Sequence, residues 1–391
     1  MLLNTSEDYK NVLLAILGSH ALFILCLISN IIVPNYDNVS GGFVSYYYLQ
    51  SAIYCAFLIY FLPKQKLTNL FVFSRTQFGR FLLILGITLV IFKCVDKIIL
   101  RPPENFFNMR KYRMAKEGSS NIFSVCSVLI GYSLPFLLQV GERMYRIKIS
   151  KYIKSVCKLA CLIHLLDLIL VGSRGIAVLY VLCMFPVKMK FRNSFILFVS
   201  VASLSCIWFI FRTSWLHNID QDRMFVHMDH YLFDGYSRYV PISNWAAHYF
   251  STSSAYQIVF GFCHIIQYIT HGFFEYAYVF QNNSYFNLSI GHITPHLNIS
   301  VIDNMHNIHK GLYYSLNGSM HLSFGLCSVL FIPVVSYFHL KFYTICKALY
   351  GHVSILPCLI IAINPYVNSF GGYDIYIIIV CSIIASKIAI K

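Results

Sequence analysis

Apolar runs alternate with short polar loops along most of this chain of 391 residues. A helix needs about 20 mostly apolar residues to cross the hydrocarbon core of a bilayer, and ten runs come near that length. The pattern therefore predicts an all-α, polytopic membrane protein with about ten transmembrane helices. The predicted spans are residues 11–33, 43–62, 79–95, 121–140, 154–171, 175–187, 194–211, 319–339, 349–367 and 373–389.

One long segment, residues 212–318, interrupts this alternation. Connections in compact folds are usually a handful of residues, so a segment of this length is typical of a functional domain or of a linker. Its many aromatic residues favour a folded domain over a disordered linker. The chain thus divides into a first membrane bundle with seven spans (1–211), a large loop domain (212–318) and three C-terminal spans (319–391).

The distribution of positive charge predicts an orientation, because Lys and Arg in short loops favour the cytoplasmic side. With the N-terminus inside, the inner loops hold eighteen of the thirty basic residues, and every inner loop is basic. The large loop domain then lies on the outer side of the membrane. Residues 255–281 within it are interpreted as an interfacial or re-entrant helix, because one further span would reverse the sides of the basic C-terminal loops.

Residues 255–281 show two faces in a helical register. The apolar face includes Phe273 and Phe280, and the polar face recurs at spacings of three, four or seven residues. His271 and Glu275 lie one turn apart on the polar face and can touch. A carboxylate beside a histidine raises the basicity of the ring, which suits a general base near neutral pH. The alternative is an amphipathic helix whose polar side simply faces water. The polar face comprises Gln257, His264, Tyr268, His271, Glu275 and Tyr278.

A short glycine-rich turn, residues 172–175, contains Arg174. Neither flanking run, 154–171 or 175–187, comfortably crosses a core of about 30 Å, so the turn is expected partly at membrane depth. An arginine at that depth is a candidate functional residue. Asp167 lies seven residues earlier, on the same helical face. Two interpretations stay open, namely that Arg174 binds an anion or that it forms a structural pair with Asp167.

One predicted outer loop, residues 93–120, is basic and so contradicts the usual bias. Two explanations of this positive charge have equal standing. The loop adheres to anionic lipid headgroups, or it binds an anionic ligand on the outer side of the membrane. The cations of this loop are Lys93, Lys97, Arg101, Arg110, Lys111, Arg113 and Lys116.

Composition excludes a soluble globular domain, because 58% of the residues are hydrophobic and only 12% are charged. The thirteen cysteines fall almost entirely in apolar runs, so they are interpreted as small buried hydrophobic residues rather than disulfides. Some spacings in the large loop suit metal ligands, but none has the tight multi-ligand pattern of a structural zinc site. No metal and no cofactor is assigned. These spacings are Asp220 with Asp222, His292 with His296, and His306 with His309.

The architecture over the full length, with three local patches, resembles a bacterial O-antigen polymerase of the Wzy type. The patches are Gly172-Ser173-Arg174-Gly175, Met109-Arg110-Lys111-Tyr112-Arg113 and the run Tyr268-Ile269-Thr270-His271-Gly272-Phe273-Phe274-Glu275-Tyr276. The resemblance implies a GT-C-like, metal-independent glycosyltransferase of the inner membrane with its catalytic side in the periplasm. The expected partners are an undecaprenyl-diphosphate-linked oligosaccharide and membrane lipid, with a chain-length regulator protein as a further candidate and no nucleic acid.

The resemblance also implies roles for particular residues. Arginines suit the diphosphate, since a guanidinium is always charged and binds phosphate oxygens with two parallel hydrogen bonds. His271 and Glu275 are the expected catalytic pair, and Asp167 and Tyr268 are expected to support the site. The candidate diphosphate ligands are Arg174, Arg110, Arg113, Arg212 and Arg223.

Two other functions remain as alternatives. An O-antigen ligase would use the same chemistry on a different acceptor. A flippase for lipid-linked oligosaccharides belongs to another class, and such transporters usually contain internal repeats, which this sequence does not display.

Overall fold

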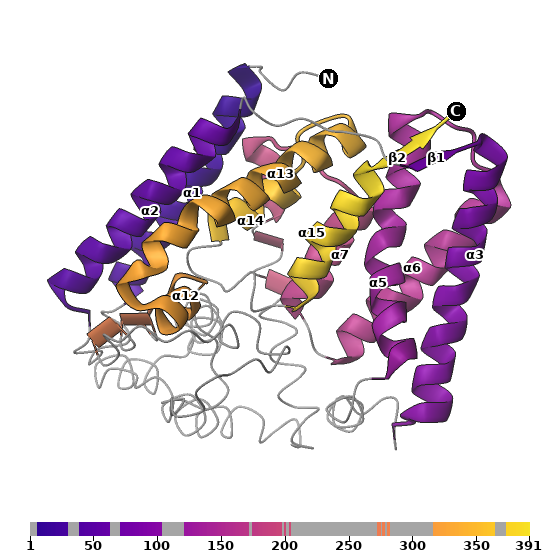
Figure 1. The fold of residues 1–391 in the computed structure, drawn as a ribbon, viewed down its shortest axis with the longest axis horizontal. Coiled ribbons are helices and arrows are strands. Elements are labelled where there is room, and N and C mark those ends of the chain that lie inside the picture. The colour runs from indigo at the N-terminus through magenta and orange to yellow at the C-terminus, as the bar shows by residue number, and fades with distance from the viewer. Residues whose placement is uncertain are drawn as a thin grey trace.

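A computed structural model describes most of the predicted bundle and little of the large loop. The described residues are 6–29, 39–62, 71–103, 121–171, 174–197, 199–200, 203–204, 272–274, 276–277, 280–281, 316–363 and 373–391. Helices dominate them, so the expectation of a largely helical chain is confirmed there. The described α-helices, labelled in Figure 1, are α1 (Ser6–Ser29), α2 (Gly41–Phe61), α3 (Arg75–Cys94), α5 (Ile122–Gln139), α6 (Lys151–Val171), α7 (Arg174–Met184), α12 (Leu316–Phe324), α13 (Ile332–Tyr350), α14 (Ile355–Ile363) and α15 (Tyr373–Ser386).

Irregular helical turns and one short strand pair complete these elements. The π-helices η2 (Val95–Leu100) and η3 (Val140–Met144) extend α3 and α5, and the 3₁₀-helix η6 (Gly325–Phe331) precedes α13. Strand β1 (Phe71–Phe73) pairs in parallel with the C-terminal strand β2 (Ile388–Ile390).

Short polar side chains define where three of the helices begin. Ser74 caps α3 in a capping box, in which its hydroxyl accepts from the Gln77 N–H and the Gln77 side chain accepts from the Ser74 N–H. Ser40 caps α2 and Asn121 caps α5 in the same way, each accepting a hydrogen bond from a backbone N–H three residues later.

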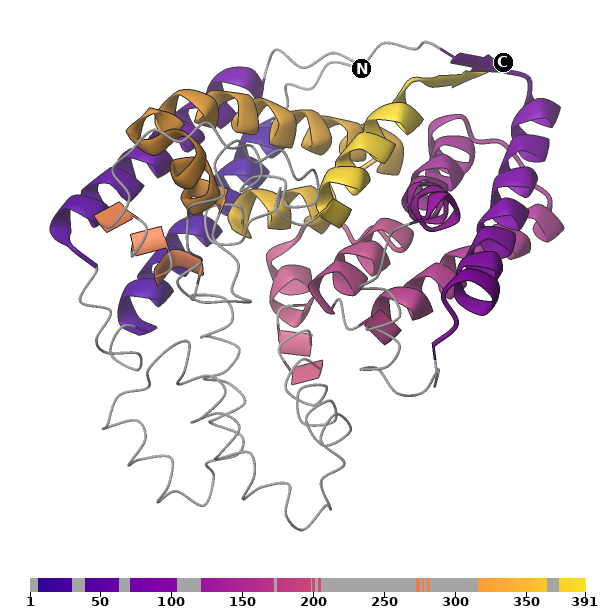
Figure 2. The same ribbon diagram turned by 60° about the horizontal axis from the view of Figure 1, so that its bottom comes forward.

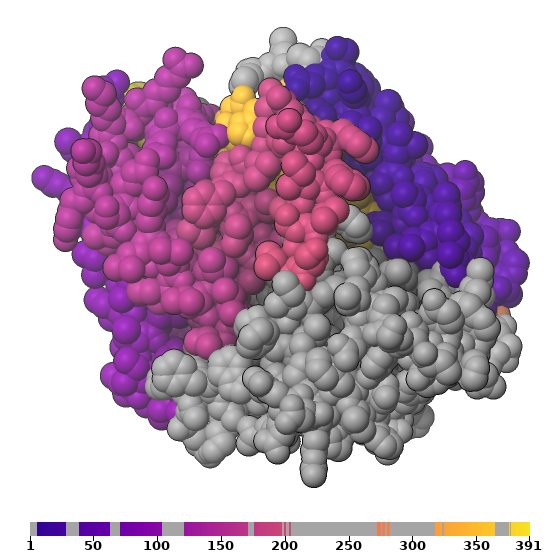
Figure 3. Space-filling view, turned by 180° about the vertical axis from the view of Figure 1, so that it is seen from behind, coloured from indigo at the N-terminus to yellow at the C-terminus, as the bar shows by residue number. Residues whose placement is uncertain are grey.

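The helices form two groups that share α13 and α14. In one group α3, α5, α6, α7 and α15 pack around a common core, and in the other α1 and α2 pack on α13 and α14. Figure 1 shows α13 running diagonally between the groups, and Figure 2 shows the same helices turned by 60°. Seen from behind, the chain that follows α6 lies between the magenta helices and the indigo α1 (Figure 3).

The loops that the sequence assigned to one side of the membrane meet at one end of the molecule, the top of Figure 1. There β1 pairs with β2, and Lys188 forms a bridge with Ser354. Also at this end, the Arg143 guanidinium donates to the Tyr350 carbonyl at 3.1 Å, and Lys347 binds Asp8 near the N-terminus at 2.6 Å. The alternation of helices up and down the bundle therefore agrees with the order of the predicted spans.

Four described helical segments are long and apolar enough to cross a membrane: Ser6–Ile28, Gly41–Phe61, Ile122–Met144 and Gly325–Tyr350. The last one corrects the sequence prediction, which ended a span at residue 339 and began the next at residue 349. Gly325 has a φ of 55° and Gly351 a φ of 72°, a conformation that favours glycine, and the helical segment runs between them.

Lys341 and Lys347 consequently lie within α13 rather than in an inner loop. Lys347 is tolerated in the helix because Asp8 of α1 accepts two short hydrogen bonds from its ammonium group, at 2.6 and 2.7 Å. The Tyr343 hydroxyl donates a third hydrogen bond to this carboxylate at 3.1 Å. A pairing between residues so distant in sequence leaves no trace in the hydropathy pattern.

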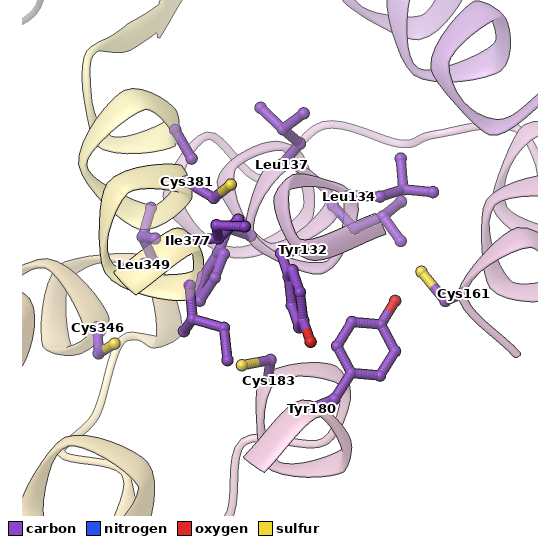
Figure 4. Close-up of a cluster of buried hydrophobic side chains, with 14 of the residues drawn as sticks. Tyr132, Leu134, Leu137, Cys161, Tyr180, Cys183, Cys346, Leu349, Ile377 and Cys381 are labelled. Atoms are coloured by element: carbon purple, nitrogen blue, oxygen red, sulfur yellow. The ribbon is translucent and has the colours of Figure 1, made fainter. Parts of the chain in front are cut away.

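The larger core joins helices from both ends of the chain (Figure 4). The labelled side chains there include Tyr132 of α5, Cys183 of α7 and Cys381 of α15, and the Tyr180 hydroxyl of α7 points toward Cys161 of α6. All eleven described cysteines are free thiols, and seven of them are buried. The interpretation of the cysteines as small buried hydrophobic residues is confirmed for these seven.

Candidate functional site

A cluster of buried charged side chains lies where α3 ends, at the end of the bundle opposite to β1 and β2. Lys93 comes from the last turn of α3, Asp96 and Lys97 come from η2, and Asp167 comes from the last two turns of α6. Five Asp, Glu, Lys or Arg residues are buried in the described part of the chain, and these are four of them; the fifth is Asp8. Buried charges are costly in a membrane bundle, so their concentration marks this end as the candidate site.

Asp167 is the acceptor at the centre of the cluster. The Lys93 ammonium group donates a hydrogen bond to one of its carboxylate oxygens. Lys97 lies 3.7 Å from the other oxygen and also 3.7 Å from Asp96. The two lysines stand one helical turn apart, so both can reach a carboxylate that α6 presents to α3.

Asp96 is held by two further side chains. The Arg101 guanidinium donates to both of its oxygens at 2.8 Å, and the Asn121 amide donates at 2.6 Å. Burial alone would raise the pKa of Asp96, but the hydrogen bonds from Arg101 and Asn121 and the nearby positive charges outweigh it, so the pKa lies below its ordinary value. Asn121 also caps α5, so this contact ties the start of α5 to the end of α3.

The charged cluster brings together three cations, Lys93, Lys97 and Arg101, and two carboxylates, Asp96 and Asp167. The cluster also includes a π-helix, a rare element that is frequent at functional sites. Charged side chains buried in an apolar helix bundle are candidates for function, and this cluster is therefore the candidate functional site.

A buried histidine lies one turn before Asp167 on α6. The His164 ring packs edge-on against Tyr132 and Tyr180, with ring centroids 4.9 Å apart in both pairs. It also covers the backbone of Gly131, where an added Cβ would come within 2.7 Å of the ring. The Tyr180 hydroxyl donates to the Gly131 carbonyl at 3.0 Å. These contacts fix α5, α6 and α7 to one another beside the charged cluster.

The predicted diphosphate ligands fall largely outside the described residues, including Arg110, Arg113, Arg212 and Arg223. The same holds for the predicted catalytic pair His271 and Glu275, for Tyr268 and for the metal-like spacings of the large loop. Arg174 is the first residue of α7, but its side chain is not among those that the structure describes.

Two corrections concern residues that are described. Lys93 and Lys97 are not in an outer loop, because α3 and η2 continue the helical chain past both of them. Asp167 has lysine partners on α3 and η2, while its predicted pairing with Arg174 stays a prediction because the Arg174 side chain is not described. Helix α6 has 21 residues, about 31 Å, and is long enough to cross the core alone, whereas α7 with 11 residues is not.

Sequence reasoning placed Lys93, Asp96 and Lys97 in a loop and so did not assign them to the site. The available signal was their spacing: Lys93 and Lys97 stand four residues apart and follow an apolar run without a glycine or proline between them. That pattern is compatible with a continuing helix.

The described residues define a class: a largely helical chain with four helices long and apolar enough to cross a membrane, and with a buried cluster of charged side chains at one end. No protein-family model, no curated protein and no solved structure matches the chain.

Proposed function

We propose that this protein is a polytopic glycosyltransferase that polymerises lipid-linked oligosaccharide repeats, such as those of O-antigen. It transfers a chain carried on undecaprenyl diphosphate to the non-reducing end of a new lipid-linked repeat. The observation that carries the proposal is the cluster of buried charged side chains around Asp167, to which Lys93, Asp96 and Lys97 belong. It lies at the end of the bundle where α6 gives way to α7 and Arg174.

The proposed reaction needs positive charge at the leaving group. A hydroxyl of the acceptor sugar attacks the anomeric carbon of the donor, and the bond from that carbon to the diphosphate oxygen breaks. Undecaprenyl diphosphate leaves with the electron pair, and a base takes the proton of the hydroxyl. Cations fixed near the diphosphate in a site without water stabilise the developing charge, by about 3 kcal/mol for a well-placed donor. We assign this role to Arg174, with Arg110, Arg113, Arg212 and Arg223 as further candidates.

We assign the proton transfer to His271, oriented by Glu275. In a helical register, positions 271 and 275 fall opposite to positions 273, 276 and 280. Phe273 and Tyr276 are buried against α1 and α2, and Phe280 packs on the same cluster. The opposite face of this segment is therefore the one that we propose for the substrate.

The proposal includes ten spans with the large loop in the periplasm of the inner membrane. Its support is the basic end of the bundle, where β1, β2 and the loops around residues 145–150 and 185–190 meet. Reporter fusions at Ser150 and His292 test the orientation. A periplasm-specific reporter should be active at His292 and inactive at Ser150, and the reverse result contradicts this topology.

Two experiments together decide the function: the lipopolysaccharide ladder of a strain that lacks the gene, and a reaction of the purified protein with a lipid-linked repeat. If the protein is a polymerase, we expect lipid core with a single repeat in the strain and elongation of the repeat in the purified reaction. Bare core in the strain would contradict the proposal and indicate a ligase or a flippase. Of these two, only a ligase would transfer finished polymer to lipid core in the purified system.

A further inference from the structure

The described part of the large loop is anchored in the bundle. Phe273, Phe274, Tyr276 and Ala277 are at most 1% exposed, and they pack in a cluster with residues of α1 and α2. In both ribbon views their short ribbons lie beside the end of α2 that begins at Gly41, near α12 (Figures 1 and 2). Phe43 of α2 meets the rings of Phe273 and Tyr276 with centroids 5.1 Å apart in each pair.

A relay of buried hydrogen bonds runs through this contact. The Tyr276 hydroxyl donates to the Gln50 side-chain oxygen at 2.9 Å, and the Gln50 amide donates to the Ser328 hydroxyl at 3.1 Å. Tyr276, Gln50 and Ser328 are all fully buried. The relay thus connects three segments that are distant in sequence: the large loop, α2 and η6.

The far end of the relay is fixed as well. The Tyr46 hydroxyl lies 2.9 Å from the Ser328 hydroxyl and donates to the Leu326 carbonyl at 2.8 Å. The His321 ring of α12 packs against the rings of Tyr46 and Tyr276, with centroids 5.9 and 5.6 Å apart. A buried phenol and a buried amide are costly without hydrogen-bond partners, so the relay favours a single position of the Tyr276 side chain.

We propose that Tyr276 and Gln50 are positioning residues, which hold the large-loop segment around Tyr276 in one orientation on α2. This inference rests on the proposed function, in which the opposite face of that segment acts on the substrate. A rotation by one residue turns a helix by about 100°, which would remove Tyr276 from Gln50 and turn that face away. The segment is accordingly a fixed part of the bundle rather than a lid that opens in each turnover.

The test uses the full-length protein in lipid nanodiscs and the variant Tyr276→Phe, which keeps the ring and removes the hydroxyl. Amide hydrogen exchange of the peptide that covers residues 272–281 should rise roughly tenfold, because Gln50 loses a buried partner. With a lipid-linked repeat as substrate, kcat should fall while KM stays within about twofold of the wild type, as expected when positioning and not binding is impaired.

Two further variants complete the design. Tyr48→Phe makes the same change on α2 at a side chain that is 55% exposed, and it should alter neither exchange nor kcat. Gln50→Leu should act in the same direction as Tyr276→Phe, and the second change should add little to the first, because both remove the same hydrogen bond.

The outcomes separate the two proposals. Unchanged exchange in Tyr276→Phe and Gln50→Leu overturns the anchoring. Raised exchange with unchanged kcat overturns the positioning role and leaves a purely structural contact. Absence of polymer formation by the wild-type protein contradicts the proposed function, while the exchange measurement still decides whether Tyr276 and Gln50 hold the segment.

Discussion

Replacing Asp167 by asparagine should destabilise the protein more than replacing Lys93 by methionine, although the two side chains form one buried pair. Asp167 serves two lysines, since Lys93 donates to one oxygen and Lys97 lies 3.7 Å from the other. The asparagine variant leaves both ammonium groups without the carboxylate that they share. The methionine variant leaves Asp167 with Lys97, which needs to move only a short way to take the place of Lys93.

The expected magnitudes follow from this asymmetry. Removing one partner of a buried ion pair typically costs about 3–5 kcal/mol, and we expect Asp167→Asn to lie in this range. That corresponds to a change of roughly two to three and a half orders of magnitude in the folding equilibrium. Lys93→Met should cost about 1–3 kcal/mol, since a charged partner remains. The double variant Lys93→Met, Asp167→Leu should cost less than the sum, because apolar side chains replace the pair at once.

The assay is reversible unfolding in mixed detergent micelles, followed by the loss of helical circular dichroism. The ion pair between Lys154 and Glu142 provides a matched control, with a distance of 2.5 Å and side chains 39% and 27% exposed. Lys154→Met should change the free energy of unfolding by about 1 kcal/mol or less. A loss for Lys93→Met as large as that for Asp167→Asn would refute the reasoning, and so would a similar loss in the control.

Three further predictions address other parts of the site. Gly131→Ala should cost about 1–3 kcal/mol, because its Cβ would lie 2.7 Å from the His164 ring, whereas Gly79→Ala, with its nearest atom at 3.5 Å, should cost much less in the same unfolding assay. Asp96 has a pKa below its ordinary value, so its charged form stabilises the fold above about pH 4. This stabilisation is lost as the pH falls through the pKa of Asp96 in the folded protein. Asp96→Asn should therefore flatten that part of the curve of unfolding free energy against pH. Arg174→Ala should abolish polymer in the lipopolysaccharide ladder while the protein still accumulates, and Arg174→Lys should restore little, because an ammonium group cannot make two parallel hydrogen bonds to a diphosphate.

The apolar runs predicted most helices because hydropathy is a local signal. Helices α2, α3, α5 and α6 begin within about four residues of the predicted spans, and Ser40, Ser74 and Asn121 cap three of them. The error in the C-terminal part arose at Gly325 and Gly351, where single glycines with positive φ decide the helix ends. Apolar composition is similar on both sides of these glycines, so hydropathy alone could not locate the ends.

The candidate site was harder to predict because its contacts join distant parts of the chain. Lys93 and Asp167 are separated by 74 residues, and Gln50 and Tyr276 by 226. The sequence singled out Asp167 from its position in an apolar run, but it could not identify Lys93 as the partner. A basic residue at the edge of a span has the same pattern whether it faces lipid headgroups or a carboxylate on another helix. The distinction depends on how α3 and α6 pack.

The two buried ion pairs of the bundle differ in a way that bears on function. At the basic end, the Asp8 carboxylate accepts hydrogen bonds from Lys347 and from the neutral Tyr343. This contact joins α1 to α13. At the other end, counted over the described side chains, three cations share two carboxylates on a π-helix and on α6. The charged cluster lies beside the start of α7 and Arg174, to which we assign the diphosphate, and for this reason the cluster rather than the Asp8–Lys347 pair supports the proposed reaction.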